Sequence, residues 1–340
     1  MLKANRERLA NLWQAVGNSP MIAVSYSYQG GPQQQILVKC EQGNLTGSIK
    51  DRMALYLLEK AYETGAIQPG DQIVEASSGN TGIALAAIGS ALGHPVRIIM
   101  PDWLSRERSE LIRAYGAEVQ LISAAEGGFL GSIKQAEAMS HYDRVFLPRQ
   151  FRNRYNVEAH ERTTGREIDR QLLLLKLKPQ AFVAGVGTGG TVMGAGGYLK
   201  SIYPDLKIHP LEPAESPTLT TGHKVGSHRI QGISDEFIPA IVNLKALDKV
   251  IQVNDGDAII MAQRLGKELG LGVGISSGAN LLGAIKVQQA LGHPAVVVTV
   301  FADNNQKYLS TALFEKEQAK PGYWSPDIKL MNYSIHERLR

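Results

Sequence analysis

The sequence predicts an α/β protein of two domains, each with a mostly parallel, twisted sheet flanked by helices. Three observations predict this class. Short β-branched runs alternate with helical stretches along the chain, as in parallel sheets covered on both faces. The chain has 340 residues, enough for about two domains. Many of its 35 glycines lie in short clusters between the periodic segments, where we expect tight, ligand-contacting turns.

Eight segments are short, β-branched and bounded by turn residues, so we expect them to form strands. In chain order they are 71–76, 96–101, 117–123, 144–148, 181–186, 207–213, 249–253 and 295–302. One sheet of that many strands would be large, which favours two sheets with a cleft between them.

Helical patterns separate these strands. They occupy 51–64, 81–92, 105–115, 131–139 and 258–269, and a further helix is expected after the glycine-rich loop that follows residue 185. The last segment, from about 315 to 340, is polar and contains Pro321 and Pro326. We expect an irregular tail there, packed on the body or on a partner chain.

Composition excludes several classes of protein. Hydrophobic residues make up 44% of the chain and charged residues 20%, which is ordinary for a globular protein. The formal net charge is only +4, and no Lys/Arg block concentrates it, so nucleic-acid binding is not expected. The N-terminus lacks a signal-type apolar core and no long apolar run occurs, so we expect a cytoplasmic protein without membrane contact.

Cys40 is the only cysteine, which excludes an internal disulfide and fits a reducing compartment. It lies in the segment ILVKCE, which has the composition of a buried strand. A small core residue is the favoured interpretation, and a reactive thiol is the alternative.

The first candidate functional cluster is GNLTGSIKDRMALYLLEKA, residues 43–61. Lys50 stands where a helix begins, although the helix dipole disfavours a cation at that end. The same field, together with desolvation, lowers an amine pKa and suits a Schiff-base nucleophile. An ordinary surface lysine is the alternative.

The second cluster is EASSGNTGIALA, residues 75–86, where a strand ends and an apolar helix begins. Free backbone N–H groups and hydroxyls at such a helix start bind carboxylates or phosphates. A simple N-cap by Ser or Asn is the alternative. Five small polar residues in a row exceed what a cap needs, which favours anion binding.

The third cluster is AFVAGVGTGGTVMGAGGYL, residues 181–199. Gly185, Gly187 and Gly190 have the G-x-G-x-x-G spacing of dinucleotide-binding loops, and Glu212 follows at the distance of the ribose-binding acid. That fingerprint normally opens the first βαβ unit, whereas here it arrives mid-chain. A phosphate cradle of backbone amides is the interpretation we favour. Pyridoxal 5′-phosphate would unite all three clusters, since it needs a Schiff-base lysine and a phosphate site, and its amino-acid substrate adds a carboxylate.

Several motifs together resemble the cysteine synthase and cystathionine β-synthase family of pyridoxal-phosphate enzymes. They are GNSPMI, NLTGSIKDR, EASSGNTGIALA, MPDWLSRERSELIRAYGAEV, AHERTTGREI, GVGTGGT, GISSGA and KYLSTALF, in the family's order between about residues 10 and 315. The chain resembles the type B cysteine synthases more than type A. The resemblance implies the two-domain fold type II architecture, similar to the tryptophan synthase β-subunit, with the cofactor in the interdomain cleft. It implies a smaller domain at 48–155, a larger one at 10–47 plus 156–315, and a tail at 316–340.

The resemblance also implies residue roles. Lys50 would hold pyridoxal phosphate and move the Cα proton, Asn80 would bond the cofactor's ring hydroxyl, and Ser276 would face the pyridine nitrogen. The phosphate would be held by Gly187, Thr188, Gly189, Gly190 and Thr191. The substrate would be bound by Ser77, Ser78, Asn80, Thr81, Gln150 and Gly232. His160 and Tyr308 match family positions and are expected to pack or hydrogen-bond, with direct chemistry by His160 as the alternative; no metal site is expected.

The implied reaction is β-replacement on an activated serine such as O-acetylserine, with sulfide adding to an aminoacrylate to give L-cysteine. The alternatives are conversion of L-cysteine to L-serine and hydrogen sulfide, and condensation with a thiol as in cystathionine β-synthase. A scaffold protein without catalysis and a nicotinamide dehydrogenase are rivals from other classes. The resemblance suggests a homodimer, with serine acetyltransferase as a possible partner.

The main departure from the family is QGISDEFIP at 231–239, where many cysteine synthases read GIGAGFIP. Asp235 takes the place of alanine and Glu236 that of glycine. At about 5 Å a carboxylate opposes hydrosulfide by roughly 3 kcal/mol at an effective dielectric near 20. Neutral water meets no such repulsion, and a carboxylate can accept its proton. We therefore expect Asp235 to lie at the mouth of the site and to favour water addition at Cβ; a solvated loop acid is the alternative.

Overall fold

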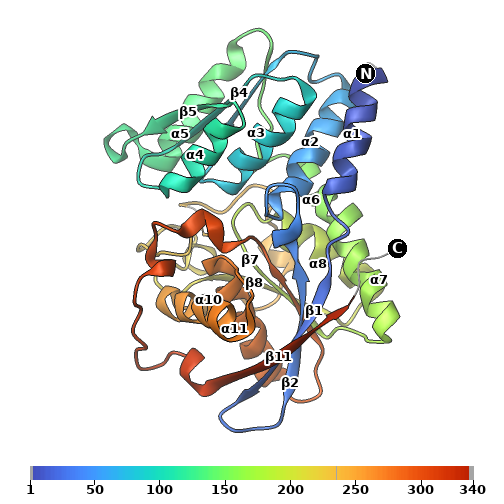
Figure 1. Ribbon diagram of the computed structural model, residues 1–340, viewed down its shortest axis with the longest axis vertical. Coiled ribbons are helices and arrows are strands. Elements are labelled where there is room, and N and C mark those ends of the chain that lie inside the picture. Colours follow the sequence, from blue (N-terminus) through green and yellow to red (C-terminus); the bar gives the residue numbers. More distant parts are fainter. Residues whose placement is uncertain (1–2, 235, 337–340) are drawn as a thin grey trace.

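The structure is a computed structural model that describes residues 3–234 and 236–336. The described residues form two separate sheets, each covered by helices, and the two parts are stacked along the long axis of the molecule (Figure 1). The α/β class with parallel sheets flanked by helices is confirmed. The domain boundaries at 48–155 and 316 stay a prediction.

The smaller sheet has four parallel strands in the order β5-β4-β3-β6. Its strands are β3 (Gln72–Ala76), β4 (Val96–Pro101), β5 (Glu118–Ile122) and β6 (Val145–Phe146). The helices of this part are α1 (Lys3–Ala15), α2 (Lys50–Thr64), α3 (Asn80–Leu92), α4 (Arg106–Ala114) and α5 (Gly128–Ala138). All four predicted strands of this region are present, within a few residues of the expected bounds.

The larger sheet has seven strands in the order β11-β1-β2-β10-β7-β8-β9. Its strands are β1 (Met21–Tyr28), β2 (Gln34–Cys40), β7 (Ala181–Gly185), β8 (Lys207–Pro213), β9 (Ile251–Val253), β10 (Val297–Phe301) and β11 (Ile328–His336). From β2 to β9 neighbouring strands are parallel, whereas β1 is antiparallel to both β2 and β11. Its helices are α6 (Arg154–His160), a π-helical turn at Glu161–Gly165, α7 (Arg166–Leu175), α8 (Gly190–Ile202), α9 (Thr218–Thr221), α10 (Asp255–Leu269) and α11 (Ile275–Leu291).

The expectation of an irregular C-terminal tail is wrong. Residues Ile328–His336 form β11, which pairs antiparallel with β1 over its length with one register shift at Ser25/Tyr26. The prolines that suggested irregularity precede this strand, so they do not interrupt its hydrogen bonds. Trp324, just before β11, stacks on Tyr28 of β1 with ring centroids 4.7 Å apart.

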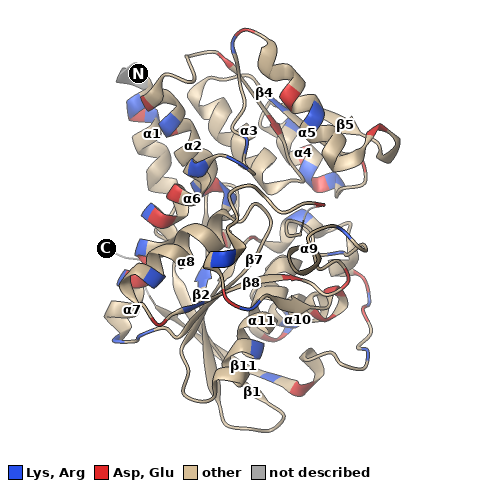
Figure 2. Ribbon diagram, turned by 180° about the vertical axis from the view of Figure 1, so that it is seen from behind, with Lys and Arg blue, Asp and Glu red and all other residues tan. Residues whose placement is uncertain are grey.

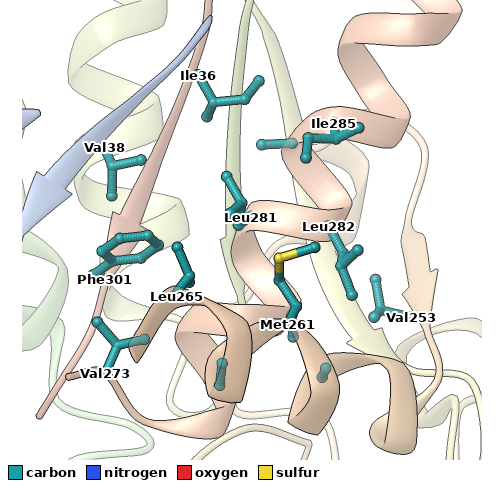
Figure 3. Close-up of a cluster of buried hydrophobic side chains, with 14 of the residues drawn as sticks. Ile36, Val38, Val253, Met261, Leu265, Val273, Leu281, Leu282, Ile285 and Phe301 are labelled. Atoms are coloured by element: carbon teal, nitrogen blue, oxygen red, sulfur yellow. The ribbon is translucent and has the colours of Figure 1, made fainter. Parts of the chain in front are cut away.

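The main core lies between the larger sheet and the helices α10 and α11 (Figure 3). Met261 and Leu265 of α10 meet Leu281 of α11, and these helices pack against side chains of β2 and β10 such as Ile36 and Phe301. Burying each such side chain contributes roughly 1.5–3 kcal/mol. A second core, built on α2, α3 and the β3–β4 pair, fills the smaller part.

The outer surface carries mixed charge. Lys and Arg are interspersed with Asp and Glu on the outer helices, in keeping with the modest net charge of +4 (Figure 2). In the part of the chain that the structure describes, no helix is long and apolar enough to cross a bilayer.

Candidate active site

Strand ends from both sheets converge between the two parts of the molecule. β3 ends at Ala76, β7 at Gly185 and β10 at Phe301, and each is followed by a polar or glycine-rich turn. In open α/β sheets, ligands bind outside the carboxyl ends of the strands. A partly open cavity of about 390 Å³, counted to its solvent mouth, lies there.

The cavity is lined mostly by residues that the sequence predicted. They are Lys50, Ser77, Ser78, Asn80, Thr81, Gln150, Gly187, Thr188 and Gly232, and the structure adds Arg108 and Phe151. These residues come from six distant parts of the chain. The fold thus brings together the three clusters that were predicted separately.

Lys50 is the first residue of α2, as the sequence predicts. The segment before it is held by the larger sheet: Ile49 N–H donates to Ala302 O at 2.8 Å, and Ser48 forms an isolated bridge with Asp303. The lysine is therefore fixed where the end of β10 meets the start of α2.

A buried ionic network anchors α2 at Arg52, two residues after Lys50. Arg52 donates to Glu41 at 2.6 Å and to Glu167 at 2.7 Å, and Lys39 pairs with Glu167 at 2.7 Å. Burial disfavours the charged form of Glu167, but Arg52 and Lys39 outweigh it and lower the pKa of this carboxyl to about 2. This network joins the helix that carries Lys50 to β2 and α7.

The turn after β3 has two functions. Ser77 Oγ accepts hydrogen bonds from the N–H groups of Gly79 at 3.1 Å and Gly82 at 2.9 Å, so it satisfies backbone groups at the start of α3, although the N-cap position itself is Gly79 and not the predicted Ser or Asn. Gly79 has φ +148°, and a Cβ there would lie 2.1 Å from Arg108 Cδ, so only glycine fits. Ser78 is left to line the cavity at a helix N-terminus.

Gln150 is held against this turn. Thr81 Oγ1 donates to Gln150 Oε1 at 2.6 Å, and Gln150 Nε2 donates to Ala76 O at 2.8 Å. Behind it, Glu75 accepts the Gln150 N–H at 3.1 Å, and burial raises the pKa of the Glu75 carboxyl to about 7. Gln150 and Thr81 are therefore positioned as a pair, as the predicted carboxylate site requires.

Asn80 points at the cofactor side of the cavity. Its Nδ2 donates to Asp303 Oδ2 at 2.7 Å, and the same carboxylate oxygen accepts from the Tyr308 hydroxyl at 2.7 Å. No donor among the described residues reaches the buried Asn80 Oδ1. A buried amide oxygen without a partner implies a ligand group that supplies one, which fits the expected ring hydroxyl.

The glycine-rich loop between β7 and α8 forms a cradle. A Cβ on Gly187 would lie 2.3 Å from Gly232 O, and one on Gly190 would lie 2.0 Å from Asn156 Oδ1. Thr188 Oγ1 accepts from Asn156 Nδ2 at 2.9 Å, which fixes the loop against α6. The loop leads directly into the N-terminus of α8, where backbone N–H groups suit a phosphate.

His160 supports this loop from behind. Its ring nitrogens contact Thr164 Oγ1 at 2.9 Å and Thr191 Oγ1 at 3.4 Å. Burial, aided by the charge of Lys50, lowers the pKa of His160 to about 3, so the ring is neutral. These contacts fit the predicted hydrogen-bonding role.

The dinucleotide interpretation of the loop has no support. The Glu212 carboxylate, expected to bind a ribose, instead accepts from Leu219 N–H at 2.7 Å and from Thr220, at the start of α9. Glu212 is fully buried, and its carboxylate is bonded to groups inside the protein, which leaves it unavailable to a ribose.

The other predicted residues lie behind the lining or outside the described chain. Gly189, Gly190 and Thr191 begin α8, and Ser276 lies in the first turn of α11. Asp235 lies outside the described residues. In the described ranges, no group of three or more His, Cys, Asp or Glu could hold a metal ion.

Sequence reasoning missed Arg108. Its side chain is 2% exposed, its guanidinium lies over the Tyr308 ring at 4.5 Å from the centroid, and it donates to Ser105 Oγ at 2.9 Å. The segment SRERSELIRAYGAE only resembled a family motif, and no local pattern distinguishes Arg108 from its charged neighbours. The glycine required at 79 was the one available signal that a large side chain crosses there.

The residues present fit pyridoxal phosphate: a lysine, a partnerless amide oxygen, a glycine cradle and a carboxylate-binding turn face one cavity. When bound, the cofactor would draw electrons from the substrate's Cα and so acidify that carbon. Lys50 stands where it could carry that proton.

Comparisons with known proteins agree with this fit. The family described as "Pyridoxal-phosphate dependent enzyme" matches residues 12–303. A cysteine synthase of Staphylococcus aureus (strain N315) is 42% identical over 304 residues, covering 89% of this chain and 96% of the relative. A hydrogen sulfide-producing enzyme from Fusobacterium nucleatum superposes with a TM-score of 0.93 at 53% identity, covering 97% of this chain and 99% of that one. A second structure of that enzyme, an aspartate-to-asparagine variant complexed with an α-aminoacrylate intermediate, gives a TM-score of 0.94 at 53% identity, covering 98% of this chain and 100% of the other.

The family match spans most of the chain, including nearly all of the residues that line the cavity, and the chain therefore belongs to the pyridoxal-phosphate-dependent, fold type II enzymes of the cysteine synthase family.

Proposed function

We propose that this enzyme releases sulfide from L-cysteine and adds water at Cβ, so that L-cysteine and water give L-serine and hydrogen sulfide. The observation that carries the proposal is the 53% identity, over 97% of the chain, to a hydrogen sulfide-producing enzyme. Identity to a curated cysteine synthase is lower, at 42% over 89% of the chain. For this reason we rank conversion of cysteine to serine, an alternative in the sequence analysis, ahead of cysteine synthesis.

The assigned roles follow the lining of the cavity. Lys50 binds the cofactor and moves the Cα proton, while the turn from Ser77 to Thr81 binds the substrate carboxylate together with Gln150. The loop from Gly187 to Thr191 holds the phosphate. Asn80 bonds the ring hydroxyl through the partnerless Oδ1, and Ser276 faces the pyridine nitrogen. The roles of the residues that line the cavity are supported by that shared lining and by the partnerless Asn80 Oδ1. Those of Ser276, Gly189, Gly190 and Thr191 rest on the family resemblance.

The choice of water is assigned to the acidic segment 231–239. A carboxylate at the mouth repels hydrosulfide and can accept a proton from neutral water. Asp235 is the proposed base. Its described neighbours Ser234 and Glu236 both line an outer cavity of about 1190 Å³ that shares Ser78 and Gly232 with the inner one.

Cysteine synthesis from O-acetylserine and sulfide is the second candidate. It is favoured by the curated relative, whose name is cysteine synthase, and it needs the same lysine, carboxylate turn and phosphate loop. A third activity, condensation with a thiol, differs only in the nucleophile. All three activities remove the Cα proton and expel a group from Cβ before a nucleophile adds there, and they differ in the leaving group or the nucleophile.

Product analysis of the cofactor-loaded enzyme separates the candidates. One tube receives L-cysteine alone and the other O-acetylserine plus sulfide. Equal amounts of serine and sulfide from cysteine alone support the proposed function. Rapid cysteine formation in the second tube, with little serine in the first, overturns it in favour of the synthase.

Three further expectations from the sequence also stay proposals. We propose a homodimer, which light scattering of the purified enzyme tests, and co-purification tests serine acetyltransferase as a partner. The cytoplasmic location expected from the single cysteine also stays a proposal, and cell fractionation tests it. Sulfide and an amino acid are the small molecules that the enzyme would handle.

A further inference from the structure

The described residues of the segment 228–236, here called the wall, border the outer cavity, and Gly232 among them also lines the inner one. Ser78 and Gly232 line both cavities, while His228, Ser234 and Glu236 line only the outer one. Any nucleophile that enters through the outer cavity must pass this wall. The conformation of the wall therefore bears on which nucleophile arrives.

Ser234 has an unusual backbone conformation. Its φ of 55° is left-handed, which is uncommon for residues other than glycine, asparagine and aspartate. Its N–H donates to Val186 O at 2.7 Å, and its hydroxyl donates to Ser216 O at 3.0 Å. Such a conformation persists only where the surroundings impose it, and it is concentrated at functional sites.

His228 supplies the third contact on Ser234. Its Nε2 lies 3.1 Å from Ser234 O, and its Nδ1 accepts the N–H of Ile230 at 3.2 Å. Because Nδ1 is an acceptor, the proton of the neutral ring is on Nε2, which donates to the Ser234 carbonyl. Burial lowers the pKa of His228, which favours this neutral form.

The wall is also packed directly on the phosphate loop. Gly232 O occupies the space that a Cβ on Gly187 would need, 2.3 Å away, and Ser234 N–H bonds Val186 at the start of the same loop. Through the Ser234 carbonyl, His228 thus holds the described part of this segment against the phosphate loop. The next residue in the sequence, Asp235, lies outside the described residues, and the inference concerns the residues before it.

We propose that His228 is a positioning residue that, through the Ser234 carbonyl, fixes the wall so that water rather than a thiol is added at Cβ. The inference rests on the proposed function and deepens it. His228 touches neither inner-cavity ligand site, so its effect is on the choice of nucleophile and not on the release of sulfide.

A product ratio tests this without depending on how much enzyme is active. The holoenzyme receives L-cysteine and 2-mercaptoethanol, and the ratio of thioether to serine is measured. Because both products arise from the same bound residue after sulfide leaves, partial unfolding lowers both equally. We expect His228→Leu to raise the ratio about threefold or more, since a small misplacement near the reacting atoms has large effects.

Matched variants sharpen the result. His228→Gln keeps an N–H donor for the Ser234 carbonyl and is expected to stay close to the wild-type ratio. His209→Leu, which removes a histidine from β8 whose Nδ1 contacts Lys249 O, is the control for histidine loss and should leave the ratio unchanged. Should His228→Leu fail to fold, Ser234→Gly loosens the same carbonyl by another route. It removes the hydroxyl bond to Ser216 O and frees the backbone to leave the left-handed φ, so it should raise the ratio as well.

The outcomes are distinct. If wild type makes serine from cysteine but neither His228→Leu nor Ser234→Gly changes the ratio, the positioning role is wrong and the proposed function stands. If wild type makes no serine, the proposed function fails, and this inference fails with it. A raised ratio in His228→Leu and in Ser234→Gly, together with a wild-type ratio in His228→Gln, supports the positioning role of His228.

Discussion

The two sides of the inner cavity are built in different ways. The cofactor side consists of helix starts and glycine turns, where Gly79, Gly187 and Gly190 admit no Cβ and where side chains such as Thr81 are buried. The wall at 228–236 is held by side-chain contacts, and its Glu236 pairs with Lys224 at 2.6 Å on the partly exposed surface. Backbone geometry fixes the first side, while individual side chains fix the second.

This difference teaches where the family can change. Glycine turns and helix termini permit few substitutions, because a Cβ would collide with the neighbouring chain. The wall is held by side-chain hydrogen bonds of His228 and Ser234, so replacing either residue can shift it without a collision of the backbone. In the proposed function, the chemistry at Cα belongs to the first side and the choice of nucleophile to the second.

The strongest test of the cofactor side is Lys50→Ala. We expect turnover to fall about a thousandfold or more, because the proton carrier and the covalent anchor are both lost. The absorbance of the lysine-bound cofactor near the violet edge of the visible spectrum should disappear. A variant that keeps both this band and its turnover contradicts the assignment; thermal unfolding serves as the fold control.

Asp235→Asn is expected to reduce serine formation from cysteine about a hundredfold, the range of a lost general base. Release of sulfide in the presence of a thiol acceptor should fall less, because departure of the thiolate precedes the need for the base. Chromatography of serine and thioether measures both. An unchanged ratio of the two would make Asp235 a solvated loop acid.

The ionic network beneath Lys50 offers a test of stability. Glu167 has a folded-state pKa of about 2, below its ordinary 4.5, so its contribution is complete above about pH 4.5 and is lost as the pH falls toward 2. We expect Glu167→Gln to lower the free energy of unfolding by about 2 kcal/mol at pH 7, since Arg52 and Lys39 lose a buried partner. The difference from wild type should shrink below pH 4.5. Denaturant titrations at pH 7 and pH 3 measure it, and a difference that is constant with pH would refute the linkage.

Cys40→Ala should have the smallest effect on catalysis. The thiol is 5% exposed, and burial raises its pKa to about 12, so it carries no reactive thiolate. Turnover should match wild type, with a loss of about 1 kcal/mol in stability from the small cavity. Loss of activity without unfolding would revive the reactive-thiol alternative.

Much of the fold followed from the sequence because it depends on local pattern. The eight predicted strands were short, β-branched and bounded by turns, and all are present. The long helix α11 was missed because it is buried on nearly all sides and so lacks an amphipathic period. β1 and β11 were missed because Ser and Tyr, or exposed polar residues, interrupt their apolar character, and only their mutual pairing identifies them as strands.

The site shows the same division. Lys50, the turn at 77–81 and the loop at 187–191 are contiguous motifs, so their chemistry was readable before the structure. Arg108 and Phe151 reach the cavity from segments whose sequence pattern does not mark them as site residues. His228 contacts a backbone carbonyl six residues away, which its sequence position does not indicate. Contacts between distant segments depend on the packing of the two parts, which no local pattern encodes.

The pairing of β11 with β1 also has a consequence for how the protein behaves in solution. In the described chain β11 occupies the edge of the larger sheet, so β1, with the apolar sequence MIAV, has hydrogen-bonded neighbours on both sides. A chain cut before Ile328 would leave β1 with a row of open backbone groups, a template for strand addition between molecules. Proteolysis of the C-terminus would then appear first as aggregation and only afterwards as lost activity.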